Sequence, residues 1–211
     1  MKKLFSALSL AMAMCTSAFA QRNEVYVLCD FPTVSSSYTT NTPVKMNFDL
    51  DFVSIGAGYN RIVSISAVNP WNCMFGMNFQ YGRMRGDGEL VEGTAVEDAV
   101  FTRMQIPVSL MYAAELGKNV TLEPYAGLDV TYYFSGEDRY VLVGRRAIEK
   151  WFPGSRELNV GYHFGANLVL DKVVLGFEYQ HDLTMFDSST TQGVNMEQKW
   201  HSYNFKLGYR F

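Results

Sequence analysis

The C-terminal segment alternates so regularly between apolar and polar side chains that it predicts a β-strand with two unlike faces. Successive side chains of a strand point to opposite faces of a sheet, so residues of one parity share a face. Between Trp200 and Phe211 one parity is polar or small and the other is almost wholly apolar. The apolar parity holds His201, Tyr203, Phe205, Leu207, Tyr209 and Phe211. This segment therefore predicts a strand that separates an apolar environment from a polar one.

The same period of two recurs along most of the chain. It is weakest at residues 24–33, which could instead form an unpaired N-terminal segment. The apolar parity slips by one residue between Phe52 and Val53, as a β-bulge would produce. We expect Pro107 and Pro124 at a bulge or a strand end, because proline donates no ladder hydrogen bond. The expected strands cover residues 24–33, 45–60, 71–82, 103–112, 120–134, 158–170, 173–185 and 200–211.

The lengths of the connections distinguish a membrane barrel from a soluble β-sandwich. Two connections are very short, at 117–119 and 171–172, and three are long, at about 86–99, 136–156 and 187–198. Short and long connections alternate here, as they do in outer-membrane barrels with short periplasmic turns and long extracellular loops. We therefore expect an all-β fold, an eight-stranded antiparallel up-and-down transmembrane β-barrel. Beyond the N-terminus no apolar run approaches the ~18 residues that a helical span requires.

The N-terminus has the three parts of a cleavable signal peptide. A basic start at residues 1–3 precedes an apolar stretch at residues 4–14 and a small-x-small cleavage site. A transmembrane helix would need a longer apolar segment, and Cys15 lacks the small preceding residue of a lipoprotein signal. We expect residues 1–20 to be removed and residues 21–211 to form the barrel domain. The residues of the cleavage site are Ala18, Ala20 and Gln21.

Charge and cysteine content bear on the partners and on cross-linking. Loss of Lys2 and Lys3 with the signal peptide changes the formal net charge from −3 to −5. A nucleic-acid-binding domain would present a basic face, so we expect no nucleic-acid partner. Cys29 and Cys73 could form one bridge in an oxidising periplasm. The expected strands that carry them are not neighbours, so such a bridge would require the first segment to lie off the barrel.

Charged side chains fall on the parity that faces the lumen. An eight-stranded barrel is just wide enough inside for side chains to fill it, and buried charges must be paired. We therefore expect a packed network in which Arg103, Lys206 and Arg210 pair with carboxylates such as Glu123, Asp129 and Glu178. A narrow ion path is the alternative. The expected lumen network comprises Lys45, Asp49, Asp51, Arg103, Glu123, Asp129, Glu178, Asp182, Lys206 and Arg210.

The sequence offers little support for catalysis. His163 is expected inside the barrel, and His181 and His201 near its outer rim. His181–Asp182 followed by Ser188 suggests a lipid-modifying enzyme, but neighbouring strand residues face opposite ways, so Asp182 is poorly placed to orient His181. We find no sound Ser/His pair in this pattern. No P-loop, dinucleotide-binding or CxxC motif occurs, and we expect neither a cofactor nor a metal.

The long connections differ in charge. The one at 86–99 carries acidic residues and could bind divalent cations, whereas the one at 136–156 is rich in arginine and could contact lipopolysaccharide phosphate or a partner protein. A short helix is expected from Arg145 to Trp151. Solvated loops without a ligand are the simpler alternative. Interface girdles are expected from aromatic residues that include Trp71, Tyr81, Tyr132, Tyr162 and Tyr203.

The chain resembles the PorT-like and OmpX-type family of small outer-membrane barrels. The resemblance is carried by the segment from Tyr203 to Phe211, by Ile106-Pro107-Val108 and by the segment from Leu122 to Gly127. It implies a location in the cell outer membrane and a terminal strand that the barrel-assembly machinery reads. The residues implied in that signal are Tyr203, Phe205, Leu207, Tyr209 and Phe211. The family includes structural, adhesive and secretion-associated members and has no shared catalytic motif.

The expected function follows from these points. We expect a monomeric, non-enzymatic outer-membrane barrel that contacts lipid and lipopolysaccharide and acts on an unknown protein partner through its extracellular loops. A narrow channel for ions or small solutes is the second hypothesis. A lipid-modifying outer-membrane enzyme is the third.

Overall fold

The computed structural model describes most of the chain after residue 20. The described residues are 21–39, 47–65, 69–90, 93–142, 145–150, 158–183, 186–189 and 195–211. Within these ranges no helix is both long and apolar enough to cross a membrane.

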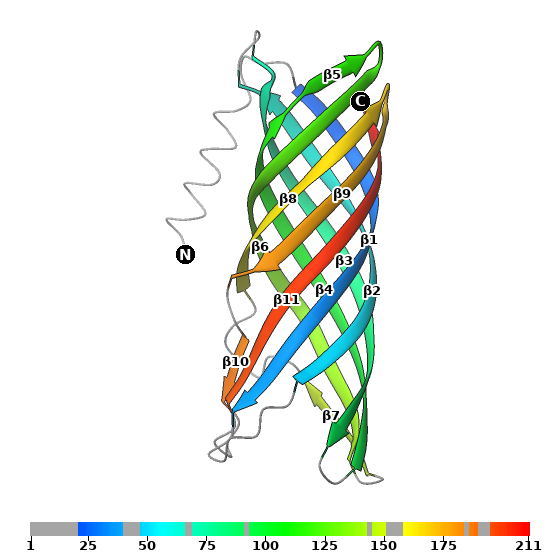
Figure 1. The fold of residues 1–211 in the computed structure, drawn as a ribbon, viewed down its shortest axis with the longest axis vertical. Coiled ribbons are helices and arrows are strands. Elements are labelled where there is room, and N and C mark those ends of the chain that lie inside the picture. The colour runs from blue at the N-terminus through cyan, green and yellow to red at the C-terminus, as the bar shows by residue number, and fades with distance from the viewer. Residues whose placement is uncertain are drawn as a thin grey trace.

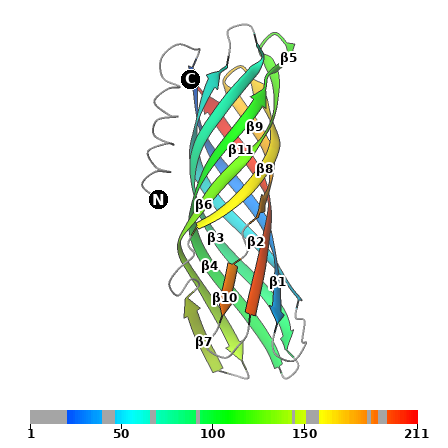
Figure 2. The ribbon, with the colours of Figure 1, turned by 90° about the vertical axis from the view of Figure 1, so that its left-hand side faces the viewer.

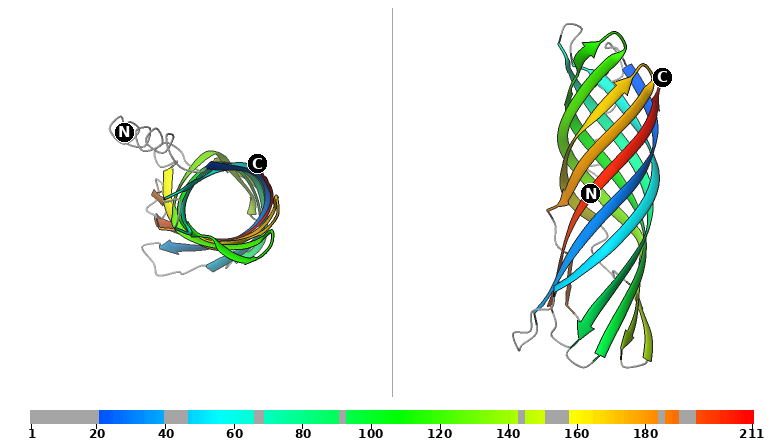
Figure 3. Two further views of the ribbon diagram at one scale, coloured as in Figure 1. Left: turned by 90° about the horizontal axis from the view of Figure 1, so that it is seen from above. Right: turned by 45° about the vertical axis from the view of Figure 1, so that its right-hand side comes forward.

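Eight long antiparallel strands close into a tilted barrel (Figures 1 and 3). Each long strand pairs with the next along the chain, and β1 pairs with β11 from Glu24↔Arg210 to Thr39↔Asn195. Closure satisfies backbone hydrogen bonds within the wall, as the interior of a bilayer requires. The long strands are β1 (Gln21–Thr39), β2 (Asn47–Ser64), β3 (Trp71–Leu90), β4 (Gly93–Tyr112), β6 (Val120–Leu142), β8 (Leu158–Leu170), β9 (Val173–Asp182) and β11 (Asn195–Arg210). The predicted fold class is confirmed, and residues 24–33 do belong to the first strand.

Both ends of the barrel sequence lie at one rim, which we call the turn end. There Asn23 and Phe211 exchange two backbone hydrogen bonds of 3.0 and 2.9 Å, so the start of β1 lies beside the C-terminus (Figure 1). The two shortest connections are at the same end. Asn119 and Asp171 have φ values of 73° and 56° in these turns. Short polar side chains tolerate this left-handed conformation, which tight hairpins require.

Strands continue into the regions where long loops are expected (Figure 2). β3 extends to Leu90 and β4 begins at Gly93, so most of residues 86–99 is strand. Three short strands, β5 (Ala114–Gly117), β7 (Arg145–Lys150) and β10 (Phe186–Ser189), pair with β6, β6 and β11. The expected helix is therefore wrong over Arg145–Lys150. These residues suit a helix individually, but the extended end of β6 offers an edge to which they pair.

The expected β-bulge between Phe52 and Val53 is also wrong. β2 keeps one register with β1 from Gln21↔Val63 to Ser37↔Asn47, and one register with β3 down to Asp51↔Arg85. Register is set by the flanking strands, which the parity of a single segment does not reveal.

The two prolines both lie within long strands. Pro107 lies within β4, and the β3–β4 register is the same on both sides of it, so the expected bulge or strand end is wrong at this position. The neighbouring strand instead supplies Gly76, where an added Cβ would lie 2.9 Å from Cγ of Pro107. The β4–β6 irregularity falls between Thr102 and Arg103. Pro124 lies within β6 and pairs with Ala166 on β8 in an unbroken register, so the expected bulge or strand end is wrong here too, although β4 gives way to β5 opposite it.

The two faces of the wall have opposite character. Outward side chains are apolar and exposed, with Ile55 at 64% and Val27 at 57%, whereas inward Asp30 and Gln105 are at most 1% exposed. A soluble protein buries its apolar face, so this inverted arrangement is that of an outer-membrane barrel with a lipid-facing exterior. An inward apolar cluster near the turn end consists of Ile62, Met74, Met111 and Tyr125.

Candidate functional site

Among the described side chains of the lumen, the most buried cation is Arg103 on β4. Its Nη2 donates to Oδ2 of Asp30 at 2.6 Å, and its Nε donates to Oε1 of Gln80 at 2.9 Å. Nη1 lies 3.4 Å from the hydroxyl of Tyr133. Asp30 also accepts from the hydroxyl of Ser54 at 3.2 Å. Arg103 is 1% exposed, so its charge depends on this set of partners rather than on water.

A second cation, Lys206 on β11, lies in a cage of aromatic and acidic groups. Its Nζ donates to Oε2 of Glu178 at 2.7 Å and to the hydroxyl of Tyr125 at 3.2 Å. That hydroxyl donates to the same carboxylate at 3.0 Å. The ammonium also lies 5.3 Å from the ring centroid of Tyr125 and 5.5 Å from that of Tyr26, within the range of a cation–π interaction. The ammonium of Lys206 is therefore held both by an ion pair and by two aromatic rings.

A third cluster lies at the turn end around Arg210. Its guanidinium binds Glu123 through two bonds of 2.8 Å and donates to Glu24 at 2.7 Å. Asn60 donates to Glu24 at 3.0 Å. Arg22, whose side chain is 37% exposed, also approaches Glu123, at 3.6 Å. One bidentate arginine thus bridges two carboxylates, with a second arginine at the rim.

Three further lumen residues form an unexpected linear relay. Oγ of Ser109 lies 2.6 Å from Nε2 of His163, and Nδ1 of that ring lies 3.2 Å from Oδ2 of Asp129. Gln180 donates to the other oxygen of the carboxylate at 3.2 Å. This is the connectivity of a nucleophile, a base and an orienting acid. The expectation that the chain lacks a sound Ser/His pair is therefore wrong.

The relay forms because a glycine separates its members. Gly127 on β6 pairs with Ser109 on β4 and with His163 on β8. An added Cβ on Gly127 would lie 2.1 Å from the carbonyl oxygen of Val108. With no side chain between them, the imidazole reaches across one strand to the hydroxyl. In the sequence, Ser109, His163 and Asp129 already have the inward parity. Only the strand order and register show that the three side chains meet.

Access to the relay is closed. Ser109 is 4% exposed, and His163 and Asp129 are each 1% exposed. The apolar cluster around Met111 lies on the turn-end side, and the cluster around Arg103 lies on the other side along β4. The hydroxyl has an oriented base, but neither group is accessible to solvent to more than 4% among the described residues of the lumen. We regard the relay as part of the packing of the lumen.

The structure places most of the expected network on the inner face. Asp182 is 4% exposed and accepts from Asn159 at 3.2 Å and from Gln180 at 3.3 Å. Lys206 and Arg210 meet Glu178 and Glu123, whereas Arg103 meets Asp30 and Asp129 meets His163. Glu24 and Asp30 are members that the sequence analysis missed, although they share the inward parity of residues 24–33.

Several expected sites fall outside what the structure describes. Lys45, Ala18 and Ala20 lie outside the described residues, and so do the side chains of Asp49 and Asp51. The same holds for the acidic side chains of residues 87–98 and the basic ones of 139–156. Gln21 begins β1. The aromatic parity of the terminal strand, expected as the assembly signal, faces outward, with exposed fractions from 47% to 61% for Tyr203, Phe205, Leu207, Tyr209 and Phe211.

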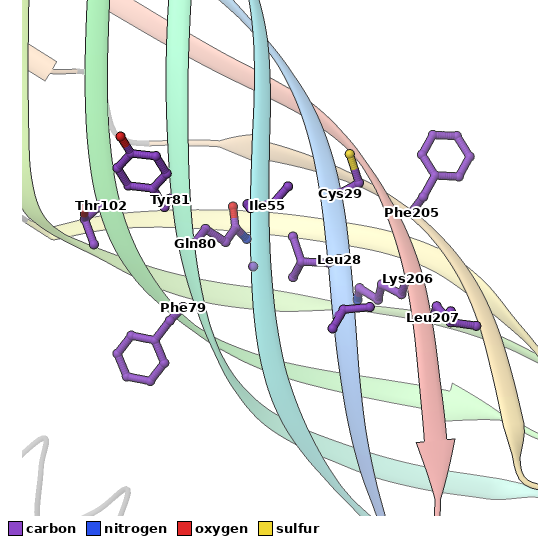
Figure 4. Close-up of a pocket in the computed structure, with 12 residues that line it drawn as sticks. Leu28, Cys29, Ile55, Phe79, Gln80, Tyr81, Thr102, Phe205, Lys206 and Leu207 are labelled. Carbon is purple, nitrogen blue, oxygen red and sulfur yellow. The ribbon is translucent and has the colours of Figure 1, made fainter.

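The outer face carries an apolar depression of about 770 Å³ over β11, β1, β2 and β3 (Figure 4). Phe79, Ile55 and Phe205 flank it, and each is about half exposed or more. Gly56 on β2 also lines the depression, although it has the inward parity of the buried Ser54 and Asn60. Because this surface faces lipid, we assign the depression to the lipid-contacting exterior rather than to the lumen. Cys29, at its edge, and Cys73 are not joined by a disulfide, so the alternative of a bridge between them is not realised.

Among the described residues, no group of three or more histidine, cysteine, aspartate and glutamate side chains is arranged to hold a metal ion.

Comparisons with known proteins give distant structural similarity alone. No model of a known protein family matches the chain, and no characterised protein matches its sequence. Among solved structures, the attachment invasion locus protein Ail of Yersinia pestis, in complex with the heparin analogue sucrose octasulfate, is similar with a TM-score of 0.45 and 14% identity over 90% of this chain and 99% of that one.

Two other structures are similar at the same distance. Neisserial surface protein A has a TM-score of 0.38 and 14% identity, with 89% of this chain and 97% of that one covered. The outer-membrane enzyme PagL has a TM-score of 0.35 and 11% identity, with 85% and 98% covered. Values this low transfer no activity to this chain.

Proposed function

We propose that this protein is a monomeric, non-enzymatic outer-membrane barrel that conducts no solute and acts through interactions at the membrane surface. The observation that carries the proposal is the packed lumen. The Arg103, Lys206 and Arg210 clusters follow one another along the barrel axis, with the apolar cluster of Ile62, Met74, Met111 and Tyr125 near the turn end. The described inward side chains are almost inaccessible to water, which supports a closed lumen over the channel hypothesis.

The terminal strand and the motifs around Pro107 and Pro124 support an assignment to a class of outer-membrane barrels. We propose that the chain is of the PorT-like or OmpX-type class and is inserted by the barrel-assembly machinery. Its lipid-facing aromatic residues would contact lipid and lipopolysaccharide. An unidentified protein would bind at the end opposite the turn end, to which the strands extend. This is an adhesion- or secretion-associated role rather than transport.

Single-channel recording of the refolded protein tests the proposal. A folded sample is first identified by a change in gel mobility on boiling. We expect a silent bilayer for the wild type. A variant that removes the central cation, Arg103→Ala, serves as a sensitivity control if it remains folded. Reproducible conductance steps in the wild type, altered by Arg103→Lys, would replace the proposal with a channel.

A hydrolase is the second candidate, because Ser109, His163 and Asp129 are correctly connected. The test is labelling by a small fluorophosphonate, with Ser109→Ala as the matched control. We expect no labelling of the folded barrel, since the hydroxyl is 4% exposed. Labelling that the Ser109→Ala change abolishes would show that the relay is reached by reagents and would make an enzyme the leading function.

A further inference from the structure

Two histidines meet on the outer face of the barrel, away from the lumen. His181 on β9 and His201 on β11 are directly opposite in the antiparallel register. Their Nδ1 atoms are 2.8 Å apart, and their rings stack with centroids 4.5 Å apart at an interplanar angle of 26°. The hydroxyl of Tyr179 lies 2.9 Å from Nδ1 of His201. Two imidazole nitrogens and a phenol oxygen therefore converge on one spot of the wall.

The surroundings place this spot at the level of an aromatic girdle. Tyr162 packs against His181 with ring centroids 5.1 Å apart, and Tyr203 packs against Tyr179 at 5.4 Å. Tyrosine gathers where a barrel leaves the hydrocarbon and meets water. β9 ends one residue after His181, at Asp182, which faces the lumen. Both imidazoles are half-buried, so ions from the aqueous side can reach them without crossing the bilayer.

Imidazole nitrogen is the protein ligand that zinc, copper and nickel share. Each neutral imidazole carries one proton, and the tautomers protonated on Nε2 present both Nδ1 lone pairs to the same point. A tetrahedral zinc ion with Zn–N bonds of about 2.0–2.1 Å holds two nitrogens about 3.3 Å apart. The observed spacing thus needs to widen by only about half an ångström. Side-chain rotation on the exposed face can supply this.

We propose that His181 and His201, with the hydroxyl of Tyr179 beside them, bind one divalent transition-metal ion, of which Zn²⁺ is the natural probe. Water completes the coordination. The ion ties β9 to β11 at the level where β9 stops, beyond which β11 still extends to Asn195 (Figure 1). The ligand is stated as a class because the donor set suits Zn²⁺, Ni²⁺ and Cu²⁺ alike.

The experiment uses the refolded full barrel in detergent without a histidine tag, since the chain has only three histidines and His163 is 1% exposed. Isothermal titration with Zn²⁺ should show one ion per barrel, and saturating Zn²⁺ should raise Tm by a few degrees. His181→Asn and His201→Asn should each weaken binding at least tenfold and remove the shift in Tm. Tyr179→Phe should weaken binding less than either histidine change.

The matched control is Tyr203→Phe, which alters the same girdle without touching either imidazole and should bind Zn²⁺ as the wild type does. Boil-dependent gel mobility identifies folded samples, and Tyr179→Phe supplies a second test if a histidine variant does not fold. The absence of Zn²⁺ binding to the wild type would overturn the proposal. Equal binding by the wild type and His181→Asn would also overturn it, because the ion would then be held elsewhere.

Discussion

The Arg103 and Arg210 clusters use the same chemistry in two different settings. Each arginine binds carboxylates at 2.6–2.8 Å. The side chains of Arg103 and Asp30 are 1% and 0% exposed, so the pair is removed from water. At the turn end, Arg22 approaches Glu123 with a side chain that is 37% exposed, and Arg210 is shared between two acids. We therefore expect the loss of unfolding free energy on removing either arginine to depend on which groups can replace its charge, more than on the length of the hydrogen bond.

The largest loss of barrel stability is expected from Arg103→Ala. This change leaves the carboxylate of Asp30 buried without its cation, and breaking a buried pair costs about 3–5 kcal/mol. Urea unfolding of the refolded barrel, followed by tryptophan fluorescence, measures the loss. Arg103→Lys should lose less, because a cation is retained although the fork geometry is not. An unchanged unfolding midpoint for Arg103→Ala would contradict the assignment of this pair as the central stabilising contact.

Lys206→Met should cause the next largest loss of unfolding free energy, roughly 3 kcal/mol. Glu178 loses the ammonium but keeps the hydroxyl of Tyr125 and the amide of Asn204. The double variant Lys206→Met with Glu178→Gln should recover much of the loss, since it removes both charges. Urea midpoints of the single and double variants form the double-mutant cycle. Strictly additive losses would mean that the two side chains do not interact.

Arg210→Ala should lower the free energy of unfolding by less than Arg103→Ala does, about 1–3 kcal/mol. Arg22 and water at the rim can partly balance the negative charge of Glu123 and Glu24. Adding Arg22→Ala should enlarge the loss by more than Arg22→Ala causes alone. High salt should reduce the difference between Arg210→Ala and the wild type, and it should hardly change the effect at Arg103. Equal salt dependence at the two sites would remove the distinction drawn between them.

The smallest loss of unfolding free energy is expected from Ser109→Ala, about 1 kcal/mol, because one hydrogen bond to the imidazole is lost and His163 keeps Asp129. Gly127→Ala is the sharper test of the relay. Its new methyl group would meet the backbone at Val108, and it should destabilise the barrel more than Ser109→Ala does. Equal midpoints for these two variants would show that Gly127 does not set the spacing.

The face of a strand can be predicted from its sequence, whereas its register with a neighbouring strand cannot. The inward positions of Arg103, Glu178, Lys206 and Arg210 follow from parity, because a strand of period two needs only a local pattern to assign a face. The slip at residue 52 and the bulge at Pro107 were wrong, since register belongs to a pair of strands and not to one. The expected helix at Arg145–Lys150 was wrong because helix propensity belongs to single residues, whereas these residues pair as a hairpin with the preceding end of β6, from Leu142↔Arg145 to Glu137↔Lys150.

By itself, the sequence determined that this chain forms an eight-stranded barrel with an apolar exterior and a charged lumen, because alternation and connection length are local properties. Only the tertiary structure decided which charges meet. Arg103 and Asp30 are 73 residues apart, and Ser109 and His163 are 54 residues apart. Closure through β1 and β11 and the register of each neighbouring pair of strands bring the two members of each pair to the same level of the lumen. Partner choice is therefore a property of the closed barrel, which no single segment contains.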